Sequence, residues 1–334
     1  MLFIINAIKI IFVLGFLVLI HECGHFFAAR ACKVKVNAFA VGFGPTIWKK
    51  KKKDTEYALR LIPLGGYVNM EGEEQRSSSE GSFSEAKIWK RIIIILAGAT
   101  VNIIFALIAY FILLLFIGQY PSTTINSINT EYDNGVEVLQ IGDEIVEVNN
   151  KNIIIRNDLE RELKKAKGNQ AEVKVNRNGE FLTFNITPIE LNGQYYLGVV
   201  LDKTEYNFSK KVYFSFRETG NFIISIGDNL KMLFTGKVGA DQLMGPIGIG
   251  EMVSKTSGIM QFAELLALIS LSLGVTNLLP FPPLDGGKIV ILVIEGVRRK
   301  PMKENIEITI QLIGFALLIA LAIYASYNDI LRIF

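Results

Sequence analysis

The sequence predicts a multi-pass α-helical membrane protein with about four transmembrane segments, a membrane-associated β-hairpin region and an inserted α+β domain. Half of the 334 residues are hydrophobic and the mean hydropathy is positive, which is too apolar for an ordinary water-soluble protein of this length. At the same time, 20% of the residues are charged. We therefore expect one part of the chain to lie in the membrane and another part to face water.

Four stretches are long and apolar enough to cross a bilayer. They lie within residues 1–30, 92–117, 258–297 and 306–327, and the regions between them are 31–91, 125–201 and 202–257. The first apolar run, residues 2–20, is interrupted only by Asn6 and Lys9. The N-terminus lacks the basic region and the small-residue cleavage site of a signal peptide, so we expect this run to be retained as a span.

The positions of lysine and arginine predict the orientation of these spans. Basic residues concentrate between the first and second spans, where residues 49–53 are five consecutive lysines, and again at 298–303 between the third and fourth. We expect both loops to be cytoplasmic and residues 118–257 to be extracytoplasmic. The lysine run is typical of a solvated loop that touches anionic lipid. We therefore expect membrane lipid as a partner, but neither nucleic acid nor a nucleotide cofactor.

A motif at the end of the first span indicates metal chemistry. His21, Glu22 and His25 form an H-E-x-x-H pattern from the only two histidines of the chain. Two histidines placed at random would lie four apart in about 0.6% of cases, even before the glutamate is considered. On a helix both imidazoles can reach one ion, while Glu22 is rotated by about 100° and can meet a metal-bound water. Structural histidines at a helix end are the alternative, but ionisable groups at membrane depth are typically functional.

Residues 31–91 predict β structure beside the membrane. Residues 41–45 and 61–68 alternate β-forming residues with glycines and show no helical stripe, so we expect short strands and turns. Gly65 and Gly66 belong to a strand whose exposed edge could pair with an extended substrate. A turn glycine pair in a structural hairpin is the alternative. The polar, serine-rich residues 71–84 predict a mobile loop.

The region from 125 to 201 predicts a small mixed domain. A turn at Gly142 leads into an alternating strand that ends near residue 149, residues 157–166 predict a helix, and a hairpin is predicted around Asn178 and Gly179. Residues 222–234 carry an apolar stripe with i, i+4 spacing. This stripe predicts an amphipathic helix, either on the membrane surface or packed against the preceding domain.

The third apolar segment, residues 258–297, is too long for one simple span, and prolines and glycines interrupt it. Broken backbone at membrane depth is tolerated only where it is buried in protein or lines a wet cavity. Asp285 lies at this break and is the natural third ligand, because two histidines and one carboxylate leave a coordination position open for water. A helix N-cap is the alternative role, but capping does not explain why a carboxylate is kept in an apolar segment.

Several motifs together carry a resemblance to a known family. They are the histidine motif, Gly42-Phe43-Gly44-Pro45, Gly65-Gly66-Tyr67-Val68, Gly245-Pro246-Ile247-Gly248-Ile249 and the run from Asn277 to Gly286. Over essentially its whole length the chain resembles the site-2 protease family of intramembrane zinc metalloproteases, in the bacterial RseP-type layout. The resemblance implies a protein of the bacterial inner membrane whose extracytoplasmic domain at 125–201 is PDZ-like.

The resemblance also implies roles for individual residues. His21, His25 and Asp285 would bind Zn²⁺, and Glu22 would act as the general base. Asn277, Pro280 and Pro282 would shape the substrate site.

The activity we expect is hydrolysis of a peptide bond within the transmembrane segment of another protein. The resemblance implies anti-sigma factors or remnant signal peptides as substrates. A transporter usually shows repeated halves, and the histidine motif has no second copy here. A non-catalytic scaffold that presents the PDZ-like domain would need neither Glu22 nor Asp285.

Overall fold

Long apolar stretches of the sequence form helices, and the regions between them supply the strands. The computed structural model describes residues 2–73, 75–116, 120–132, 134–191, 193–205, 207–236, 239 and 243–333. Residue 117, the predicted end of the second span, and part of the predicted region 202–257 lie outside these residues. The chain divides into two units, which we call the membrane unit (Met1–Tyr110 and Phe222–Phe334) and the inserted unit (Phe111–Asn221).

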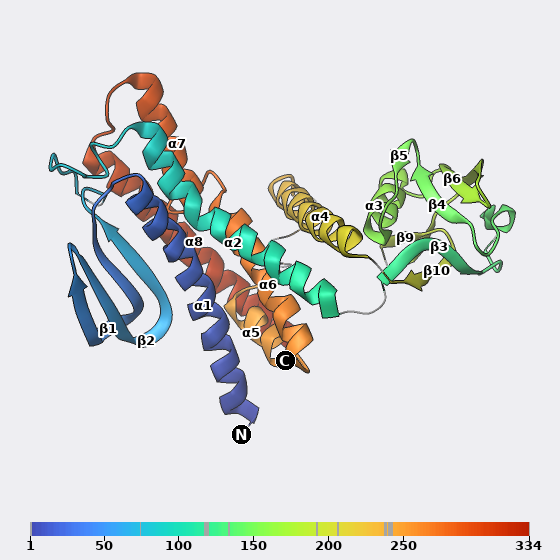
Figure 1. Ribbon diagram of the computed structural model, residues 1–334, viewed down its shortest axis with the longest axis horizontal. Coiled ribbons are helices and arrows are strands. Elements are labelled where there is room, and N and C mark those ends of the chain that lie inside the picture. The colour runs from blue at the N-terminus through green and yellow to red at the C-terminus, as the bar shows by residue number, and fades with distance from the viewer. Residues whose placement is uncertain are drawn as a thin grey trace. The chain divides into compact units, whose positions relative to one another are not determined.

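Four helices among the described residues are long and apolar enough to cross a membrane (Figure 1). They are α1 (Leu2–Ala31), α2 (Ile88–Phe116), α6 (Ile259–Asn277) and α8 (Glu304–Ile333). Large apolar side chains such as Ile108 and Leu312 remain exposed along them, as expected for helices that face lipid. Because α1 continues past the end of its apolar run, the histidine motif lies inside the helix.

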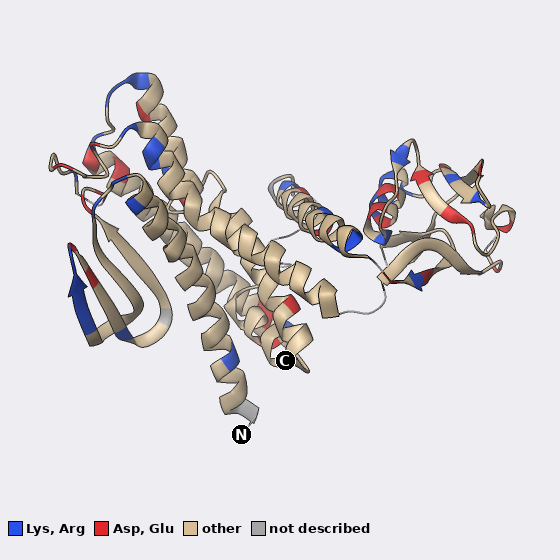
Figure 2. Ribbon diagram, viewed as in Figure 1, with Lys and Arg blue, Asp and Glu red and all other residues tan. Residues whose placement is uncertain are grey.

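Basic residues gather at one end of the membrane unit (Figure 2). This end contains the end of α1, the start of α2 and the connection between α7 (Asp285–Arg298) and α8. The residues concerned are Arg30, Lys87, Lys90, Arg91, Arg298, Arg299, Lys300 and Lys303. The start and end of the first loop and the connection between α7 and α8 therefore lie at the same end of the helices, whereas the lysine run belongs to the β hairpin beside α1.

The β region consists of two long strands, β1 (Val36–Lys52) and β2 (Thr55–Met70), and the expectation of short strands was wrong. Both strands bend, so the first half of β1 has partners on either side: Ala40 pairs with Tyr67 and with Ala58. The lysine run is also part of this sheet, because residues 49–52 pair with residues 55–58 of β2. Only Lys53 lies in the turn, which corrects the prediction of a lysine loop.

Glycines let the sheet and the helices pack closely around α1. A Cβ atom at Gly15 would collide with the carbonyl oxygen of Pro63 in β2, and one at Gly24 would lie 2.9 Å from the Cα atom of Gly98 in α2. The sheet therefore lies along α1 in the middle of its apolar run, and α2 contacts α1 at the level of the histidine motif.

The third apolar segment is broken, as predicted. Helix α6 ends at Asn277, α7 begins at Asp285, and the residues between them form turns. A side chain at Gly286 would collide with the carbonyl oxygens of Leu278 and Leu279, so the first turn of α7 requires a glycine there. The carbonyl group of Pro282 in turn lies against Gly314 of α8. The break is thus partly covered by protein, while Leu278 and Pro280 within it remain exposed.

A short helix, α5 (Pro246–Ser254), is anchored to α8. Asp329 of α8 accepts hydrogen bonds from the main-chain N–H groups of Gly245 at 2.9 Å and Gly248 at 2.7 Å. The carboxylate thereby satisfies N–H groups that have no partner within α5. The glycine motif at 245–249 therefore serves helix packing and capping in this structure.

The inserted unit contains a six-stranded sheet in the order β10-β3-β4-β6-β7, with β5 paired to β4. Its elements are β3 (Tyr120–Ile128), β4 (Glu144–Val148), β5 (Lys151–Asn152), α3 (Arg156–Ala166), β6 (Ala171–Arg177), β7 (Glu180–Ile186) and β10 (Val199–Thr204), with a 3-10 turn at Val136–Val138 and a small hairpin of β8 (Ile189–Leu191) and β9 (Gln194–Tyr196). Strand β4, helix α3 and the β6–β7 hairpin are all present where the sequence predicts them. Alternating residues such as Ile145, Val173 and Val175 are fully buried and form its core.

The predicted amphipathic helix begins earlier than expected, as α4 (Phe208–Phe234). In the inserted unit its first half packs against α3: Asn157 donates a hydrogen bond to Glu218, and Arg217 pairs with the buried Asp158 at 3.0 Å. These contacts precede the apolar stripe at 222–234, so both alternatives for the stripe stay open.

Candidate metal centre

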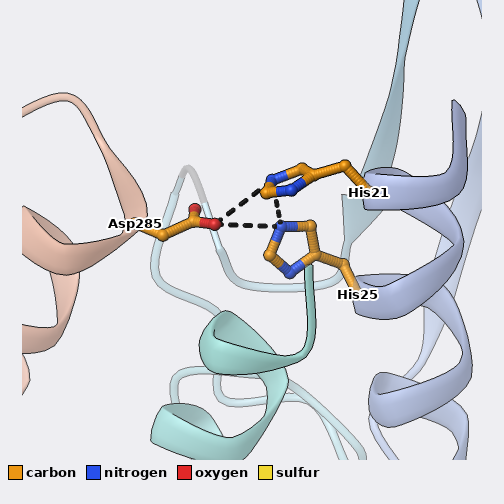
Figure 3. Close-up of side chains that lie close together, drawn as sticks. All are labelled: His21, His25 and Asp285. Atoms are coloured by element: carbon orange, nitrogen blue, oxygen red, sulfur yellow. Dashed lines mark hydrogen bonds and ion pairs between the residues drawn. The ribbon is translucent and has the colours of Figure 1, made fainter. Parts of the chain in front are cut away.

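His21 and His25 lie on one face of α1, as their spacing predicts, and Asp285 faces them from the start of α7 (Figure 3). The Nε2 atoms of the two histidines are 3.1 Å apart. The Oδ2 atom of Asp285 lies 3.2 Å from Nε2 of His21 and 3.4 Å from Nε2 of His25. Both histidines are buried. The structure thus brings together the three residues that the sequence singled out as metal ligands.

Asp285 is not the N-cap of α7, so that alternative interpretation is wrong. The N-cap residue is Leu284, and Asp285 follows it as the first helical residue. Its carboxylate is directed to the two imidazoles and makes no hydrogen bond to the main chain among those of the described residues. The turns at 278–284 and the close packing of Gly286 place this carboxylate opposite α1.

The three side chains fit a metal ion. One donor atom from each lies within 4.8 Å of the other two. Two imidazole nitrogens and one carboxylate oxygen form the donor set of a catalytic zinc site, which leaves a coordination position for water. The two cysteines of the chain, Cys23 and Cys32, are free thiols outside this group.

The environment of His25 fixes which nitrogen can bind a metal. Its Nδ1 atom is 2.9 Å from the main-chain carbonyl oxygen of Ile94 in α2. Because a carbonyl oxygen only accepts, Nδ1 carries the proton and Nε2 presents its lone pair to the centre. Both rings rest on Gly98, where an added Cβ atom would lie 2.8 Å from Cε1 of His21 and would collide with Nε2 of His25.

Glu22 lies beside the centre and is contacted by the β sheet. Its Oε2 atom accepts a hydrogen bond of 3.1 Å from the main-chain N–H of Val68 in β2. Gly65 has a positive φ of 91°, a conformation that favours glycine, and Gly66 pairs with Val41 of β1. The segment that contains Gly65 and Gly66 therefore lies between β1 on one side and the glutamate of the motif on the other.

The remaining predicted site residues lie in or next to the break. Asn277 is the last residue of α6, and Pro280 and Pro282 belong to the turns before Asp285. Asn277 and Pro282 are half-buried, whereas Pro280 is exposed. No hydrogen bond within the described part of the chain joins these three residues to the histidines or to Asp285, so their proximity rests on the chain connection alone.

A second carboxylate of the broken segment, Glu295, has a different role. It pairs with Arg76 at 2.8 Å and with Arg91 at 3.0 Å, and it accepts a hydrogen bond from the N–H of Met302. Glu295 therefore ties α7 to α2 and to the loop at 71–84, at a distance from the metal ligands. Glu73 of the same loop pairs with Lys288.

Sequence reasoning missed the contribution of α2. Gly98 provides the surface on which both histidines rest, and the carbonyl group of Ile94 orients one of them. A glycine inside an otherwise apolar helix does indicate close approach of another helix. It does not indicate which helix approaches, so the partner could be identified only from the structure.

Comparison with known proteins identifies the family. The family model described as Peptidase family M50 matches residues 9–321. FN1322 of Fusobacterium nucleatum, named as a candidate zinc metalloprotease, is 32% identical over 96% of this chain and 97% of its own length. The regulator of sigma E protease of Haemophilus influenzae and zinc metalloprotease RasP of Shouchella clausii are both 29% identical, over 97% and 98% of this chain and 98% and 99% of their own lengths.

The last two relatives align over 434 and 422 positions, more than the 334 residues of this chain, so they carry segments that it lacks. The matched region includes the histidine motif, the β sheet, the inserted unit and Asp285. The family resemblance that the motifs carried is thereby confirmed. The chain belongs to peptidase family M50.

Proposed function

We propose that this chain is a zinc-dependent intramembrane endopeptidase in which His21, His25 and Asp285 bind the zinc ion. The observation that carries the proposal is the convergence of these three side chains, from helices far apart in the sequence, on one buried point. The four long apolar helices support a site within a membrane protein. The names of relatives as zinc metalloproteases support the choice of metal.

Glu22 is the general base of the proposed reaction. When bound, a zinc ion would acidify a water molecule and polarise the carbonyl group of the peptide bond to be cleaved. Glu22 accepts a proton from the attacking water and returns it to the leaving amine nitrogen. Asn277 donates a hydrogen bond to the carbonyl oxygen as that oxygen gains negative charge. The hydrogen bond from the N–H of Val68 holds the Glu22 carboxylate in place for these steps.

The substrate is the transmembrane segment of another protein. A helical substrate hides its carbonyl groups in internal hydrogen bonds and must be unwound before cleavage. The segment with Gly65 and Gly66 is buried and not exposed as expected, but it still supports a route, because it pairs with β1 on one side and the N–H of Val68 points to Glu22 on the other. An extended substrate strand can add to this other side and lie next to the base. Pro280 and Pro282 shape the opposite side of the site.

The family and its bacterial relatives support a location in the bacterial inner membrane, and the charge pattern supports an orientation with the basic end of the helices in the cytoplasm. The inserted unit is then extracytoplasmic. The name of the Haemophilus relative, regulator of sigma E protease, supports a role in regulated proteolysis, with anti-sigma factors or remnant signal peptides as substrates. A transporter or a non-catalytic scaffold does not account for the converged donor set.

The inserted unit acts as a PDZ-like module that limits access by size. Its sheet and α3 enclose a groove of about 340 Å³, lined by Leu159 and Leu163 of α3 and by Val199 and Leu201 of β10. A groove between a helix and an edge strand could also receive a partner's chain end. We favour exclusion of substrates that still carry a bulky outer domain, because an intramembrane protease must reject most helices it meets.

Metal analysis of the purified chain in detergent tests the proposal. We expect about one tightly bound zinc ion per chain, since His21, His25 and Asp285 form one group of metal ligands. His21→Ala and His25→Ala should each abolish zinc binding and cleavage of a transmembrane substrate. A metal-free protein that still cleaves, or histidine variants that keep zinc, would refute the proposed centre.

A further inference from the structure

Two buried side chains near the metal centre have polar atoms without a partner. Among the described residues, Nδ1 of His21 and both polar atoms of the Asn102 amide make no hydrogen bond, and Asn102 is completely buried in α2. An unpaired amide in an apolar environment destabilises the folded protein, because its hydrogen bonds to water are lost and not replaced. A protein does not usually keep such a group unless the group has a partner in the working state.

The two histidines differ in what holds them. Nδ1 of His25 donates to the carbonyl oxygen of Ile94, whereas Nδ1 of His21 is buried and finds no acceptor in the part of the chain that the structure describes. Histidines that bind a metal almost always donate their second N–H to an acceptor, because this bond fixes the tautomer and the orientation of the ring. His21 therefore needs an acceptor close to Nδ1.

Helix packing brings Asn102 to the level of His21. Gly24 of α1 lies against Ala97 and Gly98 of α2, and further along Phe16 of α1 contacts Phe105 of α2 with ring centroids 5.3 Å apart. The two helices thus run in opposite directions. Asn102 follows Gly98 by one turn and lies on the same face of α2.

The direction of the side chains brings the Asn102 amide and the His21 ring toward each other. Side chains on a helix lean toward its N-terminus. The Asn102 side chain therefore extends toward Gly98, which Cε1 of His21 contacts. The His21 side chain extends toward Phe16, and hence toward the level of Asn102. Gly274 of α6 closes the other side, since an added Cβ atom there would lie 3.3 Å from Cβ of Asn102. Ser270 of α6 bonds only the main-chain carbonyl of Asn102 and leaves the amide free.

We propose that Oδ1 of Asn102 accepts a hydrogen bond from the Nδ1–H group of His21 in the zinc-loaded protein, directly or through one buried water. Asn102 is then a positioning residue: it holds His21 in the tautomer that presents Nε2 to the metal, as Ile94 does for His25. The inference rests on the proposed metal centre. It adds a second positioning residue of α2, beside Ile94, to a centre whose proposed metal ligands come from α1 and α7.

Asn102→Leu tests this role, because leucine has a similar size and no acceptor. Loss of a partner in the second shell of a metal site lowers metal affinity about 10–100-fold, and we expect such a loss in a zinc competition assay with a chelator. The melting temperature of the zinc-free protein should be unchanged or higher, because an unpaired buried amide is removed. A merely structural role for Asn102 would lower it.

Histidine NMR gives a direct readout, since the chain has only two histidines. In the zinc-loaded parent, both Nδ1–H protons should be protected from exchange. In Asn102→Leu the His21 signal should lose protection while the His25 signal keeps it. Thr100→Val is the matched control, because Thr100 is exposed on α2 and bonds only the carbonyl of Leu96. It should leave zinc affinity and both signals unchanged.

Unchanged zinc affinity and a protected His21 signal in Asn102→Leu would overturn the inference while leaving the metal centre intact. A parent protein that binds no zinc would instead refute the proposed function. If Asn102→Leu does not fold, Asn102→Asp decides, because a carboxylate is also an acceptor for a metal-bound histidine. A protected His21 signal in that variant supports the inference, and a freely exchanging one overturns it.

Discussion

Single residues of this site differ in what their replacement removes. In the proposed mechanism His21, His25 and Asp285 supply donor atoms to the metal, whereas Glu22, which accepts a hydrogen bond from Val68 of the β sheet, supplies the base. Variants at these positions should therefore separate metal binding from proton transfer. Glu295 is a buried carboxylate that pairs with two arginines, so its replacement should change neither zinc binding nor proton transfer directly.

We expect Glu22→Gln to retain zinc and lose cleavage. Glutamine preserves the size of the side chain and can still accept the hydrogen bond from Val68, but it cannot take a proton from water. General acid–base catalysis contributes about 10²–10⁴-fold, and kcat should fall by that amount. The measurement pairs zinc content with the turnover of a transmembrane substrate. Cleavage near the parental rate would remove Glu22 from its assigned role.

Asp285→Ala should weaken zinc binding together with activity. Two imidazoles alone form an incomplete site in which the charge of the metal is poorly compensated. The matched variant is Glu295→Gln, in the same helix. It should keep zinc but lower the melting temperature, because breaking a buried ion pair costs about 3–5 kcal/mol. If Asp285→Ala binds zinc as tightly as the parent, the third ligand lies elsewhere.

At the scale of elements, close contact between α1 and α2 positions the histidines. Gly98 has no side chain, and this lets both rings rest on the backbone of α2. The sheet contributes in a similar manner, since β2 approaches α1 at Gly15 and reaches Glu22 through Val68. The geometry of the centre therefore depends on helix and strand packing as much as on the motif itself.

Gly98→Ala tests this dependence. The new Cβ atom would collide with Nε2 of His25, so the rings must move and zinc affinity should fall. Gly227→Ala in α4 is the control, because nothing lies within 4 Å of an added Cβ atom there. Zinc titration of both variants checks the expectation. Equal affinity in Gly98→Ala would show that the rings can move without cost to the site.

The contact between α3 and α4 should depend on pH. Burial of Glu218, together with the nearby carboxylates of Asp158 and Glu160, raises its pKa from an ordinary value of 4.5 to about 7, against the opposing effects of Asn157 and Arg217. The folded protein therefore keeps a proton that the unfolded chain releases. The stability of the contact falls as the pH rises from 4.5 to about 7 and is constant above that.

Amide hydrogen exchange in α3 and in the first half of α4 measures this effect. After correction for intrinsic rates, protection should be greater at about pH 5 than at about pH 8. Glu218→Gln should remove the difference and retain the stronger protection at both values, because the amide is neutral throughout. An equal pH dependence in parent and variant would assign the effect to another group.

At the scale of the whole molecule, the membrane unit contains the proposed metal centre, and the inserted unit has a separate hydrophobic core. The cores share no residue, so the inserted unit can be removed without opening the metal centre. The first half of α4 must remain joined to α2 by a linker in such a deletion.

Replacing residues 120–204 by a flexible linker should let intact substrates be cut while leaving the rate for trimmed substrates unchanged. This result is expected if the inserted unit excludes bulky outer domains. The measurement compares cleavage of one substrate with and without its outer domain, and zinc content confirms that the membrane unit is folded. Loss of cleavage of trimmed substrates in a zinc-loaded protein would show that the unit recruits substrates instead.

The sequence alone determined the features that depend on local spacing. Apolar runs of membrane length, the i, i+4 histidines and the proline–glycine break are all written in neighbouring residues, and they predicted the long helices, the shared face of α1 and the position of Asp285. Alternation and turn residues likewise predicted β4 and the β6–β7 hairpin.

Only the tertiary structure decided which distant groups meet. The long bent strands β1 and β2, the bond from Val68 to Glu22 and the pairing of Glu295 with two arginines all join segments far apart in the chain. Periodicity describes which face of an element is apolar, but it does not name the element that covers that face. The sequence therefore did not reveal the contributions of Gly98 and Asn102, since each depends on how α2 packs against α1.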